Sequence, residues 1–302
     1  MNRSVTPHDS VTLFLAQKRA EGLSVNTLAS YERSLRMFLD TPGLPADVAN
    51  IGPRDAITWT ATLTEPGRGL KPGAVNAYQR PVWVWFRWLF DNGDVPIDIP
   101  RRVRRVKVTD PKRRTATQEE RERLVKVALH QHEHPNRNAA IVEVLWATGI
   151  RRAELAALQL EDYDSEAGTL FVRWGKGGKP RLVGIDASAR HAIERYIVRD
   201  RKRTPGPLFL GRKALPMTAN AVRCVLRSLS ERAKVDVSAH QFRRACAARL
   251  RREGMDLGHV MNHLGHNSPT MTLIYSKEGE TEAAIAAYHK LDAGVRPLRK
   301  SG

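Results

Sequence analysis

The residues with the clearest potential for chemistry lie in one stretch near the C-terminus. It contains two histidines, an arginine and a tyrosine: His240, Arg243, His266 and Tyr275. His240 and Arg243 are three residues apart in a sequence with a helical pattern up to Gly254, so we expect both side chains to leave the same face of a helix. Imidazole, guanidinium and phenol groups held together are suited to binding a phosphate and reacting with it. The stretch is therefore predicted to be a phosphate-handling active site.

Local turn signals indicate how these groups are positioned. Gly265 is predicted to end a helix, and Ser268 is predicted to cap the next one, with Pro269 at its first position. This places His266 in the turn and Tyr275 on the following helix. The tyrosine hydroxyl is then expected near the histidines.

Three motifs in a fixed order resemble those of the tyrosine recombinases, also called the phage integrase family of site-specific recombinases. The last is H-x-x-R followed by LGH, with Tyr275 nine residues after the histidine of LGH. Upstream, ATGIRRAEL resembles the segment with the family's first catalytic arginine, here Arg151, and GKGGKPRLV resembles the hairpin with its catalytic lysine, here Lys176. The resemblance covers roughly residues 115–291. Single motifs of this kind arise by chance, but the ordered set is specific.

The resemblance implies a complete catalytic set: Arg151, Lys176, His240, Arg243, His266 and Tyr275, with Glu154 orienting Arg151. Tyr275 would attack the DNA phosphate, leaving a 3′-phosphotyrosine and a free 5′-hydroxyl. The two arginines would bind the non-bridging oxygens, Lys176 would protonate the leaving oxygen, and the two histidines would assist proton transfer or hydrogen-bond the phosphate. Because the ester keeps the bond energy for rejoining, neither a metal nor ATP is implied, and we expect no cofactor.

The charge distribution points to a polyanionic partner. The net charge is +18 with a pI near 10.5. Residues 1–100 carry ten Lys and Arg against ten Asp and Glu, so the whole excess lies in residues 101–302. A ribosomal or histone-like protein is also basic, but a hydrophobic content of 41% favours a globular enzyme.

We expect three parts: a helical core-binding domain over 1–100, a basic interdomain linker over 101–114 and a catalytic domain with a C-terminal helix over 115–302. The linker carries five cations, which we interpret as a strap along DNA phosphates: Arg101, Arg102, Arg104, Arg105 and Lys107. The alternative is a solvated linker. These five residues are called the basic strap below.

Helical patterns dominate the first hundred residues. Ser24 is predicted to cap one helix and Pro53 to open another, and a fourth helix spans the aromatic-rich segment near residue 80. Pro81 is expected to kink or delay that helix. The aromatic cluster that follows is interpreted as core packing, with base stacking as the alternative: Trp83, Trp85, Phe86, Trp88 and Phe90.

The second domain is expected to be mainly α with a small β-hairpin. Thr117 and Glu120 form a predicted capping box, and an apolar helix ends near Gly149 so that it presents Arg151 from a packed core. Two strand-like segments flank the Gly-Gly-Lys-Pro sequence, so Lys176 is predicted near the hairpin tip. Thr218 is a further predicted cap.

The expected partner is double-stranded DNA carrying two recombination sites, bound by a homotetramer, and the pattern leaves room for accessory proteins. The C-terminal helix would pack on a neighbouring subunit, as the resemblance implies, or on its own domain. Two distant cysteines, Cys224 and Cys246, and the lack of any long apolar run indicate a cytoplasmic, nucleoid-associated protein with no membrane partner. A role in a mobile element, as opposed to Xer-like chromosome maintenance, stays open.

Three alternatives remain at this stage. A type IB topoisomerase uses similar residues to relax supercoils, and a DNA-binding regulator could retain the fold without catalysis. His259, His263 and His266 have a spacing that could form a metal-binding face, although no carboxylate or cysteine accompanies them. The chain also departs from common family patterns at Phe242, Arg244 and Cys246, which weakens assignment to any one subgroup.

Overall fold

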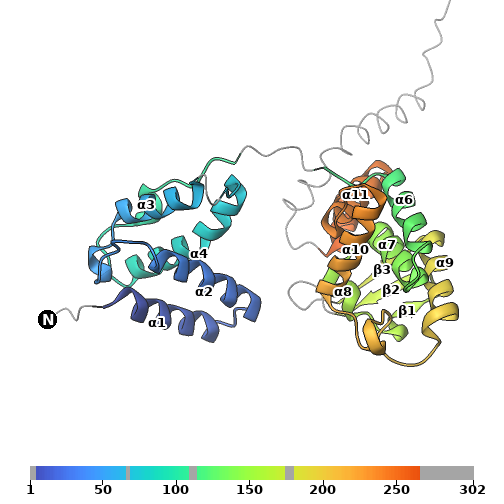
Figure 1. The fold of residues 1–302 in the computed structure, drawn as a ribbon. Helices are drawn as coiled ribbons and strands as arrows, with labels where there is room; N and C mark the ends of the chain where they lie inside the picture. Colours follow the sequence, from blue (N-terminus) through green and yellow to red (C-terminus); the bar gives the residue numbers. More distant parts are fainter. Residues whose placement is uncertain (1–4, 66–68, 109–113, 174–179, 266–302) are drawn as a thin grey trace, which may run out of the picture. The chain divides into compact units, whose positions relative to one another are not determined.

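The computed structural model describes residues 5–65, 69–108, 114–173 and 180–265. The chain divides into two compact units, one ending at Lys112 and the other starting at Arg113 (Figure 1). Within the described ranges, no helix is long and apolar enough to cross a membrane.

The described part of the first unit has four long helices, α1 (Pro7–Ala20), α2 (Val25–Leu39), α3 (Pro53–Thr64) and α4 (Pro72–Asp91), with a 3-10 turn at Val48–Asn50. The predicted Ser24 cap is confirmed, because its side chain accepts a hydrogen bond from the backbone N–H of Thr27. Prolines at the first helical positions of α1, α3 and α4 fix the backbone angle where no N–H partner is needed.

Aromatic rings form the centre of this unit. Phe38 makes edge contacts with Trp59, Trp85 and Phe86, with ring centroids 5.2–5.7 Å apart. The prediction of core packing is confirmed for Trp83, Trp85 and Phe86, whose side chains are buried.

The aromatic cluster is not wholly internal, however. Phe90 is 36% exposed and lies beneath the Arg87 guanidinium, because it faces outward from α4 one position beyond the buried Leu89. Helix α4 runs through the buried Pro81 without ending there, so the expected delay of the helix start was wrong. Its start is set by Pro72 instead.

The basic strap begins as part of the first unit. Short helix α5 (Ile99–Arg102) leads into Val103, which is buried in the same core. Asn76 then holds Val106 by two hydrogen bonds, from Nδ2 to the carbonyl (2.9 Å) and from the Val106 N–H to Oδ1 (3.1 Å). The five cations of the strap are exposed. Packing of the valines therefore turns the charged side chains outward.

The second unit is organised around α7 (Pro135–Thr148), whose residues from Arg137 onward are all buried. Three helices pack on it: α6 (Gln118–Leu129), α9 (Ala187–Tyr196) and α11 (Ala239–Arg252) (Figure 1). The predicted capping box of α6 is confirmed, with Thr117 accepting from the Glu120 N–H and Glu120 accepting from the Thr117 N–H. A helix buried on all sides suits a mostly apolar sequence.

A three-stranded antiparallel sheet completes the layer beside α7, in the order β1 (Tyr163–Asp164), β2 (Thr169–Val172) and β3 (Arg181–Gly184). In the predicted hairpin, Leu170 pairs with Val183 and Val172 pairs with Arg181. Strand β1 is an addition to the predicted hairpin. The connection between β2 and β3 carries Lys176, which lies outside the described residues.

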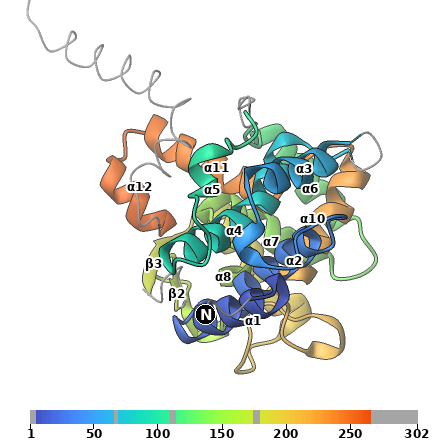
Figure 2. The same cartoon turned by 90° about the vertical axis from the view of Figure 1, so that its left-hand side faces the viewer.

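Three further helices lie next to segments that carry predicted catalytic residues or line the pocket described below: α8 (Arg152–Ala157), α10 (Ala219–Ala233) and α12 (Leu257–Leu264). Figure 2 shows α12 beside β3, and the two elements are in contact. Thr218 caps α10 as predicted, and Gly265 ends α12 in the left-handed region. The remaining short turns are at Leu160–Asp162, Ile197–Arg201 and Arg212–Ala214. The fold is mainly α with a small sheet, as predicted.

Candidate active site

Gly149 determines how the chain passes from α7 to the segment that carries Arg151. It ends α7 with a φ of 59°, a conformation that favours glycine. A Cβ at this position would lie 2.8 Å from Leu264 Cδ2 and 3.1 Å from Cys246 Cβ, so α11 and α12 approach the backbone too closely for a side chain. Arg151 follows two residues later as the N-cap of α8.

Glu154 is the buried carboxylate that orients Arg151. Its Oε2 accepts from the Arg151 backbone N–H (2.9 Å), and its Oε1 accepts from Arg151 Nη1 (2.7 Å). The Glu154 side chain is 3% exposed, whereas that of Arg151 is 30% exposed. The predicted carboxylate partner of Arg151 is therefore in contact with it, and the arginine remains open to solvent on its outer side.

The pKa of Glu154 lies below its ordinary value although the group is buried. Burial acts to raise the pKa, but the hydrogen bond from Arg181, the backbone hydrogen bond from Arg151 and the charge of Arg181 together outweigh burial. Glu154 is thus a carboxylate at neutral pH. A charged acceptor binds a guanidinium more strongly than a neutral carboxyl does.

Arg181, the first residue of β3, was not singled out from the sequence. Its Nη2 and Nη1 atoms lie 2.8 Å and 3.3 Å from the two oxygens of Glu154, and its Nε donates to the carbonyl oxygen of His263 at 2.9 Å. Nothing in the local sequence marks this arginine, because its partners are distant along the chain.

Arg243 and Arg151 both reach the end of α12. Arg243 donates to the carbonyl oxygens of Gly149 (2.8 Å) and Leu264 (2.5 Å), and Arg151 Nη2 donates to the carbonyl oxygen of Gly265 (3.1 Å). The structure therefore gathers the two predicted catalytic arginines at the residues that immediately precede His266. Arg243 is 3% exposed in this arrangement.

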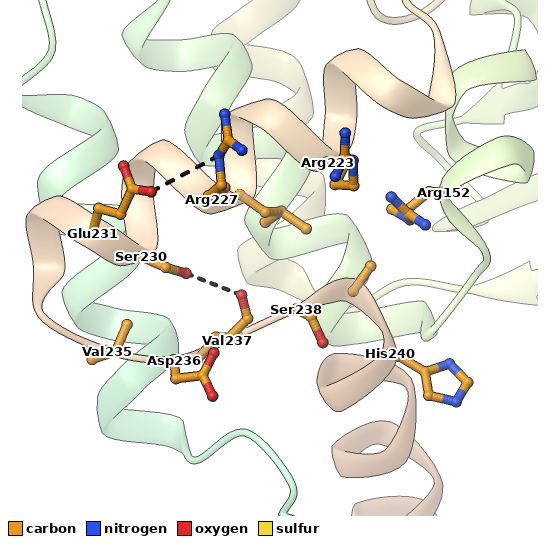
Figure 3. A pocket seen from close by; sticks show the side chains of 12 residues that line it. Arg152, Arg223, Arg227, Ser230, Glu231, Val235, Asp236, Val237, Ser238 and His240 are labelled. Carbon is orange, nitrogen blue, oxygen red and sulfur yellow. Dashed lines mark hydrogen bonds and ion pairs between the residues drawn. The ribbon is translucent and has the colours of Figure 1, made fainter. Parts of the chain in front are cut away.

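His240 lies at the start of α11, where it is exposed and lines a pocket of about 550 Å³ (Figure 3). It shares the helix with Arg243, but the two side chains differ in burial, one facing solvent and the other the interior. The pocket lies between α8, α10 and α11 (Figure 3). On its walls, Arg227 pairs with Glu231 at 3.8 Å and the Ser230 hydroxyl donates to the Val237 carbonyl at 3.0 Å.

Three exposed arginines of this pocket were missed by sequence reasoning: Arg152, Arg223 and Arg227. Arg223 and Arg227 are four residues apart on α10, and so they share its exposed face. The four-residue spacing of these two arginines could have been recognised in the sequence as a shared helix face. Arg152 adjoins Arg151 in sequence and is exposed, whereas Arg151 is partly buried.

Two other titratable groups beside the site are held in their neutral forms. Burial, followed by the charge of Arg181, lowers the pKa of His263 to about 4. Burial raises the pKa of the Cys246 thiol to about 11, and its Sγ donates to the Ala147 carbonyl (3.3 Å). Cys246 therefore packs as a small apolar residue and is not a thiolate nucleophile at neutral pH.

Lys176, His266 and Tyr275 lie outside the described residues, as do the predicted cap at Ser268 and the C-terminal helix. His259 is exposed and His263 is half-buried. Among the described residues, no group of three or more His, Cys, Asp and Glu side chains is arranged to hold a metal ion.

Residues 114–282, more than half of the chain, match the phage integrase family. The tyrosine recombinase XerD of Mycobacterium tuberculosis is 31% identical over 296 residues, a match that covers 91% of this chain and 93% of that protein.

Two solved structures share the fold. The Tn1549 transposon integrase in complex with transposon right end DNA has a TM-score of 0.77 at 20% identity, covering 95% of this chain and 100% of that one. A lambda integrase tetramer bound to a Holliday junction has a TM-score of 0.73 at 17% identity, covering 91% and 78%. These relatives are recombinases and integrases, and they give no support to a topoisomerase-like alternative. The predicted resemblance is confirmed, and the chain belongs to the phage integrase family, the tyrosine recombinases.

Proposed function

We propose that this chain is a site-specific DNA recombinase that cuts and rejoins DNA through a covalent 3′-phosphotyrosine at Tyr275. The observation that carries the proposal is the convergence of Arg151 and Arg243 on the backbone of Leu264 and Gly265. These arginines come from helices nearly a hundred residues apart in sequence, and the chain runs from Gly265 directly into the LGH histidine and on to Tyr275.

The two arginines would bind the phosphate oxygens on which negative charge builds up during attack. Arg151 is the one already open to solvent, and Glu154 fixes its direction. Arg243 is buried against two carbonyl groups, so its contact with a phosphate needs a shift of the α12 end away from it. DNA binding would then assemble the final site.

The remaining roles rest on the sequence resemblance. Lys176 would protonate the leaving 5′-oxygen, and His240 and His266 would exchange a proton with the nucleophile or hydrogen-bond the phosphate. The exposed position of His240 at the mouth of a basic pocket is compatible with contact to DNA. Neither a metal nor ATP enters this scheme, because the protein–DNA ester stores the energy for rejoining.

The tyrosines that the structure describes are less suited than Tyr275 to act as the nucleophile. Tyr163 and Tyr196 are buried, and burial raises the pKa of both hydroxyl groups, so they are poor nucleophiles. Tyr31 packs against Phe14 in the core of the first unit, and Tyr78 packs on that same core.

DNA would be held by the basic strap and by the exposed arginines of the pocket wall. The strap is proposed to follow the phosphates between a core-binding domain over 1–100 and a catalytic domain that begins near residue 115. The lambda integrase tetramer on a Holliday junction supports a tetramer on two synapsed sites for this chain as well. The protein would act on the nucleoid, on the chromosome or on a mobile element, with or without accessory proteins.

Purified protein should be incubated in EDTA with nicked duplexes tiled from the DNA that flanks its gene, followed by a search for an SDS-resistant protein–DNA adduct. We expect an adduct on one tile, and we expect none with Tyr275→Phe. An adduct that persists in the variant would contradict the assignment of Tyr275. Specific binding to one tile with no adduct would favour a non-catalytic DNA-binding regulator.

A further inference from the structure

Arg181 connects three parts of the site that the chain supplies separately. It stands at the first position of β3, just after the hairpin connection that carries Lys176. From there it binds Glu154 on α8 and the carbonyl of His263 on α12. Its side chain is 11% exposed, so these contacts are made with little competition from water.

The contact with Glu154 reaches Arg151 through a shared carboxylate. Glu154 takes Arg151 on one side and Arg181 on the other, with nitrogen–oxygen distances of 2.7 Å and 2.8 Å. Arg151 already holds Glu154 Oε2 through its backbone N–H (2.9 Å) and Glu154 Oε1 through Nη1 (2.7 Å), and Arg181 adds one bond to each of these oxygens. A second guanidinium bound to both oxygens fixes the carboxylate plane, and therefore the direction in which Arg151 points.

The contact with α12 is equally close. A Cβ at Gly265 would lie 2.9 Å from Arg181 Nη1, so the arginine lies directly against the backbone at the helix end. The backbone carbonyl of Gly265 also accepts a hydrogen bond from Arg151 Nη2, at 3.1 Å. Arg181 thus holds the point at which the chain leaves α12 toward His266 and Tyr275.

We propose that Arg181 is a positioning residue for DNA cleavage. It orients Arg151 through Glu154, and it holds the end of α12 against β3. The proposal rests on the proposed function, because it assigns Arg181 a role in that reaction. Arg181 is not proposed to touch DNA. It acts through the groups that do.

Lysine cannot replace it in this role. The three contacts use Nε and both terminal nitrogens of one planar guanidinium, and a single ammonium cannot satisfy a carboxylate and a carbonyl on separate elements in the same way. Arg181→Lys keeps the positive charge but removes the planar guanidinium and its three contacts. This variant therefore separates the effect of geometry from the effect of charge. Arg181→Met removes both.

Arg173 offers a matched control on the same hairpin. It lies just beyond β2 and binds two acids, Asp162 at 2.6 Å and Glu161 at 2.5 Å, neither of which contacts Arg151. Arg173→Lys and Arg173→Met therefore remove ion contacts of the same hairpin without touching the proposed connection. A general loss of hairpin stability would affect both sets alike.

The test measures single-turnover adduct formation on the nicked duplex and, separately, the Kd for the same duplex. We expect both Arg181 variants to cleave about 100-fold more slowly, a loss typical of a misplacement near 1 Å, with a Kd within about twofold of the wild type. Both Arg173 variants should cleave at nearly the wild-type rate. Adding Glu154→Gln to Arg181→Met should slow cleavage by less than the product of the two single effects, because the two changes share the contact between Arg181 and Glu154.

Hydrogen exchange gives a second measurement that needs no chemistry. The Gly265 N–H donates to the Asn262 carbonyl (3.1 Å), and its exchange should accelerate in the Arg181 variants and not in the Arg173 variants. Unchanged exchange at Gly265, or wild-type cleavage by Arg181→Met, would overturn the proposal. A wild-type protein that forms no adduct contradicts the proposed function instead, and the exchange result still decides whether Arg181 holds α12.

Discussion

At the scale of single residues, Glu154 is the residue whose replacement we expect to have the largest effect. Its carboxylate is buried and accepts hydrogen bonds from Arg151 and Arg181, two cations of the candidate site. Removing a buried charge that serves two others leaves both guanidinium groups without their acceptor. The residue therefore links the stability of the second unit to the orientation of Arg151, which is proposed to bind the phosphate.

We predict that Glu154→Gln lowers the unfolding free energy by about 3 kcal/mol, because a buried ion pair is broken while the shape is kept. The pKa of Glu154 is lowered on folding, so its stabilisation is complete above its unfolded-state value and is lost as the pH falls through the folded-state value. Urea unfolding of both proteins should show a constant difference from about pH 8 to 6 that shrinks below about pH 4. A difference that grows toward acid would contradict this account.

The two cysteines should differ sharply in reactivity. Cys224 is exposed, while Cys246 is buried with a pKa raised by that burial to about 11. A thiol reagent at pH 8 should therefore modify Cys224 rapidly, and native Cys224→Ser protein should stay unmodified until it is unfolded. Rapid labelling of the native variant would show that the packing around Cys246 is wrong.

At the scale of elements, the junction of α7 and α8 positions Arg151, and Gly149 makes it possible. We predict that Gly149→Ala destabilises the protein by about 3 kcal/mol, because the new methyl group would overlap Leu264 and Cys246 in a backbone conformation that favours glycine. Gly22→Ala is the control: its φ is 80° with nothing within 4 Å of the added Cβ. Only the strain of about 1 kcal/mol should remain there. Equal losses in the two variants would refute the close approach at Gly149.

Local chemistry in the sequence was enough to predict many element ends. Ser24, Thr117 and Thr218 cap helices because their side chains satisfy free N–H groups close by in sequence, and Gly149 and Gly265 end helices because they adopt positive φ. Such effects act over a few residues and are readable without a structure.

Contacts between distant segments were not predictable in the same way. The position of Arg181 depends on partners 27 and 82 residues away, and the burial of Arg243 depends on the loop at Gly149 and the end of α12. Motif spacing named Arg243 but could not show that its guanidinium binds carbonyl groups in this structure. The continuation of α4 through Pro81 likewise reflects tertiary packing that outweighs a local preference.

At the scale of the whole molecule, the excess positive charge and the predicted catalytic residues occupy the same part of the sequence. The basic strap adds five exposed cations beside a first unit that is close to neutral over residues 1–100. Its backbone is held to the first unit by Asn76 and by the burial of Val103. The backbone of the strap is thus fixed to the first unit as far as Val106, with its cations exposed.

We predict that the double variant Arg104→Gln, Arg105→Gln lowers the slope of log Kd against log salt by about two units, because each neutralised phosphate contributes close to one. Fluorescence anisotropy on a duplex at several salt concentrations measures this slope. Arg203→Gln serves as the control, since that charge is already paired with Glu194 at 2.6 Å. An unchanged slope in the double variant would make the strap a solvated linker.

The central claim is that Tyr275 attacks DNA in a site assembled by Arg151, Arg243 and the end of α12. The most direct test is mass spectrometry of the protein–DNA adduct after proteolysis and nuclease digestion, with end-labelling of the released strand. The account predicts a nucleotide 3′-phosphate on the peptide that contains Tyr275, and a released strand with a 5′-hydroxyl that kinase can label. Attachment at any other residue, or a phosphate on the released 5′ end, would contradict it.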